Sequence, residues 1–254
     1  MAVLGPRYSL KFKFMRALMN KTALFSFFIS CLLFVFCGNT QNVKNVSVQE
    51  FKKLIASGKG IVLDVRSPQE VAKGQIENAS VLNFYDDDFE SKLAFIQKDQ
   101  PVYVYCKSGG RSGKAAKLLS KLGQYEVYNL SGGLMAWEKA NLPLVAKAFI
   151  EDEHIKSFSI SDFDSLLQVH QKVLVDFHTQ WCVPCRKMVP IVAALEVELK
   201  EQVFVLRIDL DQSKDLADKY KIVSVPTFLL FNNAAEVWRQ AGLMTKEALV
   251  EQIH

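Results

Sequence analysis

The chain has 254 residues, of which 50% are hydrophobic and 23% charged, and its formal net charge is +4. This length is enough for one large domain or two small ones, each with a hydrophobic core of its own. The first 44 residues hold six basic residues and no acidic one, so the remaining residues together carry −2. The positive charge is therefore a property of the leader, and the composition does not indicate a nucleic-acid-binding protein.

The five cysteines fall into three groups: Cys31 with Cys37 near the start, Cys106 alone, and Cys182 with Cys185. A domain stapled by disulfides would carry a denser set of cysteines in a shorter chain. The observed spacing is typical of catalytic thiols instead.

An uncharged, phenylalanine-rich stretch at residues 23–37 follows a basic segment. Its length lies between that of a signal-peptide core and the ~20 residues that span a bilayer. A buried core helix is the alternative, but the basic residues before the stretch and the polar residues after it favour export. Cys37, followed by Gly-Asn, resembles a bacterial lipoprotein acylation site, although Phe36 departs from the small residue usual there. We expect residues 1–42 to be a signal peptide or membrane anchor on the periplasmic side of a bacterial membrane, with Cys37 a candidate for lipidation.

From residue 46 the sequence alternates between strand and helix patterns. The predicted strands are 61–65, 80–83 and 102–105, and the predicted helices are 48–56, a helix that starts at Ser67-Pro68, 88–97 and 113–122. Parallel α/β sheets place their chemistry at the carboxyl ends of strands, beside helix N-termini. Cys106, directly after the third strand, is therefore a candidate nucleophile.

The loop that begins at Cys106 reads C-K-S-G-G-R-S and is suited to hold an anion. Its two glycines let backbone amides turn toward the sulfur, and two basic side chains add positive charge. Such a nest stabilises a thiolate, a cysteine persulfide or bound thiosulfate. A structural cysteine before a glycine turn is the alternative. The candidate substrate-binding residues of the loop are Lys107, Ser108, Gly109, Gly110, Arg111 and Ser112.

Residues 43–147 resemble the rhodanese family. The matching residues are Asp64-Val65-Arg66, Ser67-Pro68, Glu70, the C-x-x-G-x-R-S loop, Leu130-Ser131-Gly132-Gly133 and Ala136-Trp137; Gln75 departs from the histidine of many members. The resemblance implies a parallel sheet flanked by helices, and a sulfurtransferase that carries sulfane sulfur as a persulfide on Cys106. Cysteine phosphatases have one more residue between cysteine and arginine than the four that separate Cys106 from Arg111, which argues against phosphatase activity.

The second thiol site is Trp181-Cys182-Val183-Pro184-Cys185, between a predicted buried strand at 173–177 and a predicted helix at 186–200. Cys182 lies where the helix begins, so free amides and the helix dipole should lower its pKa and make it the attacking thiol. Cys185, one turn further, is expected to be more shielded and to resolve the mixed disulfide. Zinc is the alternative for two cysteines at this spacing, but such a site needs about four ligands and the sequence has no second C-x-x-C or H-x-x-x-H.

The second half has its own order of elements, after a predicted linker at 148–157. The predicted helices are 161–169, 213–220 and 246–253, and the further predicted strands are 204–208, 228–231 and 236–240.

Residues 158–254 resemble thioredoxin. The matching residues are the W-C-V-P-C motif, Asp176, Val225-Pro226-Thr227 and Ala241-Gly242. The resemblance implies a mixed sheet flanked by helices and a substrate groove lined by Trp181, Val225, Pro226 and Gly242. It also implies that Asp176, buried with a raised pKa, accepts a proton from Cys185; a capped polar residue at a strand end is the alternative.

Two residues depart from the thioredoxin pattern. Val183 replaces the usual glycine between the cysteines. His178 replaces an aromatic residue and is either a tuner of Cys182 or an exposed edge histidine. Both departures bear on the redox potential, so the direction of thiol exchange stays open.

The sequence therefore predicts a two-domain α/β protein, an exported sulfurtransferase and thiol–disulfide oxidoreductase without metal or cofactor. The expected partners are a sulfane sulfur donor such as thiosulfate or a persulfide, protein or small-molecule disulfides, and a transmembrane thiol-electron donor. We expect sulfur to pass from Cys106 to Cys182, with sulfide released by Cys185; the alternative is that the fusion only co-localises two activities that act on separate substrates. The alternatives are a membrane-tethered disulfide reductase whose rhodanese domain only binds, and a sulfur or electron carrier that docks to one partner.

Overall fold

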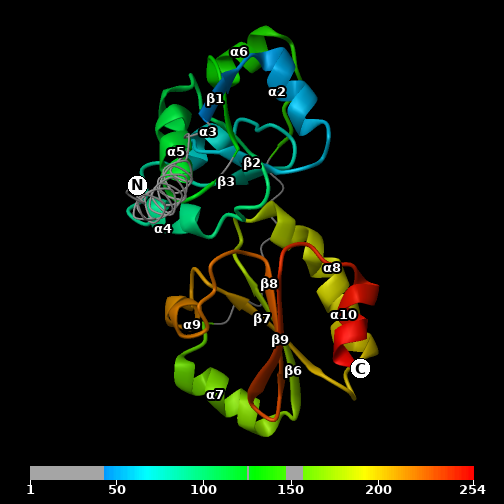
Figure 1. The fold of residues 1–254 in the computed structure, drawn as a ribbon. Helices are drawn as coiled ribbons and strands as arrows, with labels where there is room; N and C mark the ends of the chain where they lie inside the picture. Colours follow the sequence, from blue (N-terminus) through cyan, green and yellow to red (C-terminus); the bar gives the residue numbers. More distant parts are fainter. Residues whose placement is uncertain (1–42, 125, 147–156) are drawn as a thin grey trace, which may run out of the picture. The chain divides into compact units, whose positions relative to one another are not determined.

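The structure, a computed structural model, describes residues 43–124, 126–146 and 157–254. The predicted leader at 1–42 and all but the last residue of the predicted linker lie outside these residues. The described part of the chain contains one five-stranded and one four-stranded sheet (Figure 1). None of the helices in these ranges is both long enough and apolar enough to cross a membrane.

The first sheet is entirely parallel, as expected, with the strand order β1-β5-β4-β2-β3. Its strands are β1 (Val43–Val46), β2 (Ile61–Asp64), β3 (Ala79–Val81), β4 (Val102–Tyr105) and β5 (Val127–Leu130). Strand β4 lies between β5 and β2, so the carboxyl ends of these three strands meet at one edge of the sheet. This edge receives Cys106, the residue that follows β4.

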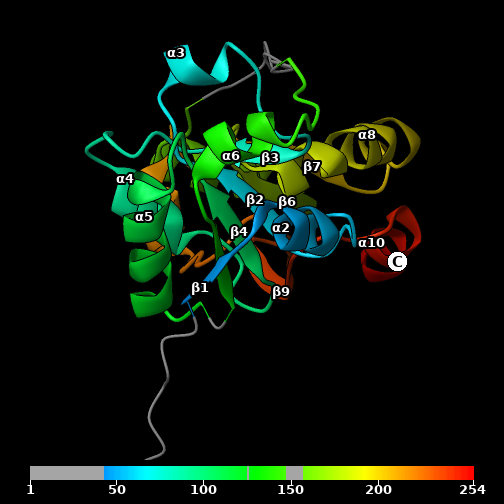
Figure 2. The same cartoon turned by 90° about the horizontal axis from the view of Figure 1, so that it is seen from above.

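Helices cover both faces of this sheet: α4 and α5 lie on one face, α2 and α6 on the other (Figures 1 and 2). The helices are α2 (Val48–Ile55), α3 (Pro68–Val71), α4 (Phe89–Ala94), α5 (Gly110–Lys121) and α6 (Gly133–Lys139). Side chains of β4 alternate between the two cores because strand residues point to opposite faces. Val104 packs with Leu119 of α5, whereas Tyr105 packs with Phe51 of α2 and Trp137 of α6. The strand that delivers Cys106 is thus fixed from both sides.

The second sheet is mixed and has the order β7-β6-β8-β9, with β6 parallel to β7 and antiparallel to β8. Its strands are β6 (Lys172–His178), β7 (Phe204–Asp209), β8 (Thr227–Asn232) and β9 (Ala235–Ala241). Its helices are α7 (Ile160–Val169), α8 (Val183–Glu198), α9 (Lys214–Lys219) and α10 (Lys246–Ile253). Helices α8 and α10 lie on one side of the sheet and α7 and α9 on the other (Figure 1).

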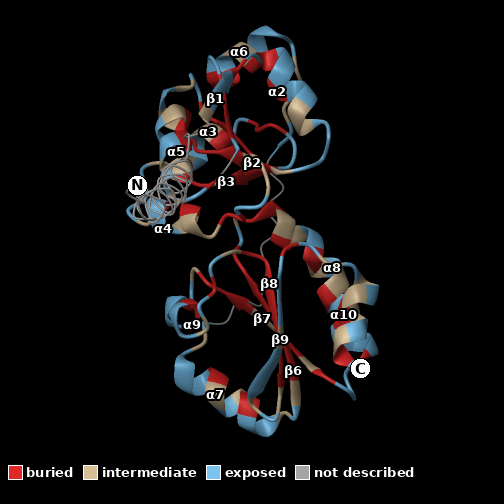
Figure 3. Cartoon of the chain, viewed as in Figure 1, coloured by how far each residue is buried: buried red, intermediate tan, exposed pale blue. Residues whose placement is uncertain are grey.

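Each face of the second sheet has its own core. Phe163 of α7 packs with Phe177 of β6, whereas Val192 of α8 packs with Leu249 of α10. Strands β6 and β8 are buried almost throughout, but β9 is mostly exposed, as an edge strand is (Figure 3). Strand β6, which ends close to the cysteine pair in sequence, therefore lies at the centre of the domain.

Two helices begin earlier than predicted, and both begin at thiol sites. Helix α5 starts at Gly110 and not at residue 113, and α8 starts at Val183 and not at residue 186. Glycine lowers helix propensity and proline is usually read as a break, but Pro184 lies in the first turn, where its missing N–H costs nothing. Helix α4 is shorter than the predicted 88–97, and β1 and β5 were not predicted. A helix that ends at Asn141-Leu142-Pro143 was predicted without its start, and α6 is that helix.

Candidate functional site

Cys106 lies directly after β4, at the N-terminus of α5, and is 1% exposed. It is the free cysteine among those that the structure describes. Its Sγ accepts a hydrogen bond from the Gly109 N–H at 3.1 Å and one from the Ser112 hydroxyl at 3.4 Å. Burial acts to raise the pKa of Cys106, but the hydroxyl and N–H of Ser112 with the N–H groups of Ser108 and Gly109 outweigh it, so the pKa lies below its ordinary value. The predicted anion cradle therefore exists around this sulfur.

Helix α6 orients the amides of the cradle. The Leu134 N–H donates to the Cys106 carbonyl at 2.8 Å, and the Met135 N–H donates to the Lys107 carbonyl at 3.0 Å. In a trans peptide the N–H points away from the C=O of the same unit. Holding the Lys107 carbonyl toward α6 therefore turns the next N–H, that of Ser108, to the opposite side, where Sγ accepts it.

Two glycines permit this arrangement. Gly109 is the N-cap of α5 with a φ of +94°, a conformation that favours glycine. Gly133, at the start of α6, has a φ of +57°, and a Cβ there would lie 2.4 Å from the Cys106 carbonyl oxygen. The glycine pair after β5 was noticed in the sequence, but its role as the contact surface for the Cys106 loop was not predicted.

Arg111, predicted to bind substrate, is held by Glu70 of α3. Its Nη1 donates to Glu70 Oε2 and its Nη2 to Glu70 Oε1, both at 2.7 Å. The Ser67 N–H also donates to Glu70 Oε2, at 3.2 Å, and closes the capping box of α3. The hydrogen bonds from Arg111 lower the pKa of Glu70 to about 2, and those to Glu70 raise the pKa of Arg111. Glu70 belonged to the family resemblance but was not among the predicted site residues.

A cavity of about 130 Å³ opens beside the loop, and Lys107, Glu70 and Met135 are among its lining residues. Another lining residue, Arg66, donates to both oxygens of the buried Asp64 and is thereby neutralised. Lys107 is exposed and forms no ion pair with a described residue. Because Arg111 is paired with Glu70, Lys107 is the cation of the loop that is free to bind an anionic sulfur donor.

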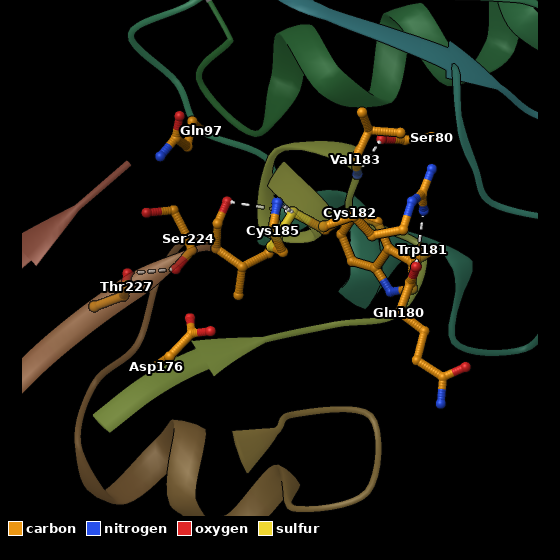
Figure 4. Close-up of a disulfide and its surroundings, with 12 residues drawn as sticks. Ser80, Gln97, Asp176, Gln180, Trp181, Cys182, Val183, Cys185, Ser224 and Thr227 are labelled. Atoms are coloured by element: carbon orange, nitrogen blue, oxygen red, sulfur yellow. Dashed lines mark hydrogen bonds between the residues drawn. A yellow bond between two sulfur atoms is a disulfide. The ribbon is translucent and has the colours of Figure 1, made fainter. Parts of the chain in front are cut away.

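The second thiol site is a disulfide between Cys182 and Cys185, with an S–S distance of 2.11 Å (Figure 4). Cys182 is the N-cap of α8, and its Sγ accepts a hydrogen bond from the Cys185 N–H at 3.1 Å. The predicted position at a helix N-terminus is therefore correct. The two residues are 3% and 1% exposed, so exposure hardly distinguishes an attacking cysteine from a shielded one in the oxidised form.

The predicted groove residues gather beside this disulfide. The Val225 carbonyl oxygen lies 3.9 Å from the Sγ of Cys182, and the peptide bond between Val225 and Pro226 is cis. The Gly242 N–H donates to the Pro226 carbonyl at 2.8 Å. Trp181, next to Cys182, donates through Nε1 to Asp211 Oδ1 at 3.4 Å. Residues distant in sequence thus meet around one sulfur pair, as the resemblance implied.

Asp176 is completely buried inside β6, and its side chain points toward the disulfide (Figure 4). It does not end a strand, so the alternative of a capped strand-end residue does not apply. Arg207, its register partner on β7, donates from Nε to Asp176 Oδ2 at 3.0 Å. Sequence analysis missed Arg207, because only the strand register places the two residues together. His178 is 5% exposed, so its description as an exposed edge histidine is wrong.

No arrangement suited to a metal ion occurs within residues 43–124, 126–146 and 157–254, where no three His, Cys, Asp or Glu side chains cluster. The two sites present sulfur atoms, backbone amides and fixed charges. Cys106 offers a stabilised thiolate or persulfide, and Cys182 with Cys185 offers a reversible disulfide.

We expect Gly133→Ala to disturb the Cys106 cradle. The added Cβ would displace the Cys106 carbonyl, at a cost of about 1–3 kcal/mol for overpacking. The pH midpoint of Cys106 alkylation should rise, since the Ser108 and Gly109 amides lose their direction. The matched control is Gly113→Ala in α5, whose Cβ would make an ordinary contact of 3.5 Å with Asn129. Equal midpoints in both variants would contradict the assigned role of Gly133.

We expect Arg207→Met to destabilise the second domain by about 2–4 kcal/mol, because it removes the guanidinium from a buried carboxylate. Hydrogen exchange of β6 peptides, followed by mass spectrometry, measures the effect. The double variant Asp176→Asn/Arg207→Met should recover much of the loss, since no buried charge is then left without its cation. A double variant no more stable than Arg207→Met would show that the pair is not what stabilises β6.

Comparison with known proteins assigns both halves. Residues 47–140 match the Rhodanese-like domain family and residues 154–254 match the Thioredoxin family. Thioredoxin Y, chloroplastic, of Oryza sativa subsp. japonica is 37% identical over 99 residues, and Thioredoxin Y2, chloroplastic, of Arabidopsis thaliana is 42% identical over 100; each match covers 39% of this chain and 59% of the relative's length.

A bacterial relative is matched over nearly its whole length. The Thioredoxin of Chlamydia pneumoniae is 39% identical over 100 residues, which are 39% of this chain and 96% of that protein. The solved structure of Fasciola hepatica thioredoxin is 35% identical and covers 37% of this chain and 91% of that one, with a TM-score of 0.36. With a rhodanese-like domain at residues 47–140, this chain belongs, through residues 154–254, to the thioredoxin family.

Proposed function

We propose that the protein is a sulfurtransferase coupled to a thiol–disulfide oxidoreductase, in which Cys106 carries sulfane sulfur and the Cys182/Cys185 dithiol reduces it or other disulfides. The observation that carries the proposal is the set of hydrogen-bond donors around Cys106 Sγ. Donors of this kind stabilise the negative sulfur of a thiolate and equally that of a persulfide. The motif match to the rhodanese family supports the same assignment.

In the first step the Cys106 thiolate attacks the outer sulfur of a donor such as thiosulfate. A sulfur–sulfur bond forms to Cys106 while the sulfur–sulfur bond of thiosulfate breaks, and sulfite leaves with the electron pair. The product is a persulfide, whose terminal sulfur carries the negative charge. Lys107, exposed at the cavity beside the loop, attracts the anionic donor.

In the second step the reduced pair consumes the persulfide. The Cys182 thiolate attacks the outer sulfur, so that Cys106 leaves as a thiolate and Cys182 becomes the persulfide. The Cys185 thiolate then attacks Cys182 Sγ, which forms the 182–185 disulfide and releases sulfide. The two electrons that reduce the sulfur come from the dithiol, and a thiol donor must restore it. Asp176, buried on β6, is the group we assign to accept the proton of Cys185.

A single-turnover experiment on the full chain tests this sequence of steps. The protein is reduced, treated with thiosulfate and followed by intact mass and by sulfide release. Wild type should release sulfide and end with the 182–185 disulfide, whereas Cys106→Ser should gain no sulfur and release no sulfide. Cys185→Ser should gain sulfur but release no sulfide, because the persulfide on Cys182 then lacks its resolving thiol.

The panel also separates the competing functions. If thiosulfate adds no sulfur to wild type while disulfide reduction proceeds, the protein is a disulfide reductase whose rhodanese-like domain only binds. If sulfur stays on Cys106 and neither activity turns over without an added protein, the chain is a carrier that serves one partner. With a disulfide substrate in place of thiosulfate, mixed disulfides trapped in Cys182→Ser and none in Cys185→Ser would reverse the roles of the pair.

We also propose that the protein works outside the cytoplasm, held at a bacterial membrane by residues 1–42. The support is the basic segment before an uncharged, phenylalanine-rich stretch, followed by Cys37. A transmembrane thiol carrier would then supply the electrons that restore the dithiol. Fractionation of cells should place the protein in the membrane or periplasmic fraction. If Cys37 is acylated, labelled fatty acid is incorporated and is lost in Cys37→Ala, whereas an uncleaved anchor incorporates none. Full-length protein in the cytosolic fraction would disprove export.

A further inference from the structure

Arg111 belongs to the loop that begins at Cys106, but its guanidinium is bound to the carboxylate of Glu70. Both of its terminal nitrogens bind Glu70, each at 2.7 Å, and its guanidinium lies over the ring of Tyr85 at 5.6 Å. A bidentate guanidinium–carboxylate pair fixes distance and orientation together. The charge of Arg111 is thereby largely neutralised, while its position is fixed.

Glu70 is itself held in place. It caps its own helix through the Ser67 N–H, and its carbonyl accepts a hydrogen bond from Arg66 Nη1 at 3.2 Å. Arg66 in turn is bound to Asp64, which is completely buried at the end of β2. An unbroken chain of hydrogen bonds thus runs from the sheet to Arg111.

Arg111 is also the residue before Ser112, whose N–H and hydroxyl are donors to Cys106 Sγ. A shift of the Arg111 backbone would move both donors, because they belong to the adjoining residue on the first turn of α5. The position of Ser112 therefore depends on where Glu70 holds Arg111. The orientation of Cys106 and Lys107, at the start of the loop, depends on α6.

We propose that Glu70 is a positioning residue for the sulfur carrier: by clamping Arg111 it holds the first turn of α5 in the orientation that directs the Ser112 donors at Cys106. The anionic donor is then received by Lys107 and not by Arg111. This inference rests on the proposed function in taking Cys106 as the sulfur carrier. The effect of the Glu70–Arg111 pair on the pKa of Cys106 is nevertheless measurable without any sulfur transfer.

Electrostatics alone makes the opposite prediction for the loss of Glu70. Removing a nearby negative charge stabilises a thiolate and lowers its pKa, whereas loosening the Ser112 donors raises it. The charged groups around the loop are Lys107 and Arg111 on the loop itself, Glu70 and Lys73 of the α3 region, Asp64 at the end of β2 with Arg66 after it, and Glu138 of α6. The ionisable Tyr85 and Tyr105 lie nearby. Only the clamp predicts a rise when Glu70 is replaced.

The experiment is the pH dependence of Cys106 alkylation by neutral iodoacetamide, measured on the full chain with the 182–185 disulfide intact and read from the Cys106 peptide by mass spectrometry. Since the pKa of Glu70 is about 2, the pair stays charged throughout the measured range of roughly pH 5 to 10. Glu70→Ala should raise the midpoint by about 0.5 pH unit or more. A midpoint that is unchanged or lower would overturn the proposal.

A second variant keeps the test decisive if Glu70→Ala fails to fold. Arg111→Lys retains the positive charge but cannot form the bidentate pair, so the clamp predicts a raised midpoint and charge alone predicts none. Ser112→Ala should raise the midpoint as well, and the size of that shift shows what the loss of one hydrogen-bond donor to Cys106 does to the midpoint. Glu138→Ala removes a carboxylate from the wall of the same cavity without touching Arg111, and it should leave the midpoint in place or lower it.

The same variants separate this inference from the proposed function. Thiosulfate KM should rise in Lys107→Gln, with the alkylation midpoint little changed, whereas Glu70→Ala should lower kcat at a given pH. If wild type transfers no sulfur but Glu70→Ala and Arg111→Lys raise the midpoint, the clamp stands and the proposed function fails. If sulfur transfer proceeds and neither variant moves the midpoint, the clamp is disproved while the proposed function stands.

Discussion

The hydrogen bonds from α6 to the carbonyls of Cys106 and Lys107 are the constraint on which the first thiol site depends. They hold the carbonyls of Cys106 and Lys107 away from the sulfur and so turn the amides that follow toward it. The approach is close enough to exclude a Cβ at Gly133. Sheet order makes this possible, because β5, which leads to α6, is the direct neighbour of β4.

The two thiol sites stabilise the sulfur of a cysteine by the same kind of contact. In each, a cysteine lies between a strand and the next helix, and its sulfur accepts a backbone N–H from the N-terminal end of that helix at 3.1 Å. They differ in what surrounds that contact. Cys106 receives further donors and bonds to no other sulfur of the described residues, so it suits the storage of a negative sulfur. Cys182 is bonded to Cys185 and suits electron exchange. The chemical division between the domains follows from this difference.

Most strands and helices were predictable because their apolar patterns are local. Helix α10 and strand β4 have the bounds that the sequence predicted, and both cysteine motifs lie at the predicted strand–helix junctions. Strands β1 and β5, which were not predicted, have only four residues each and show no alternation. Such elements form through pairing with neighbours and not through their own propensity.

The partners of the site residues were beyond prediction for a related reason. Glu70 and Arg111 are separated by 41 residues, and Asp176 and Arg207 by 31. No pattern within either segment indicates which carboxylate meets which guanidinium, since that depends on strand register and helix placement. The roles assigned to the site residues, the domain boundaries and the leader stay predictions.

The position of Gly133 also has a consequence for the order of events during synthesis. The ribosome makes Cys106 before it makes β5 and α6, so the loop emerges without the amides that orient it. Until those residues leave the exit tunnel and pair with β4, the loop lacks the hydrogen bonds that turn its amides toward Cys106, so the thiolate is less stabilised. The stabilisation of the Cys106 thiolate is thus completed only when β5 and α6 have been made and have folded onto β4.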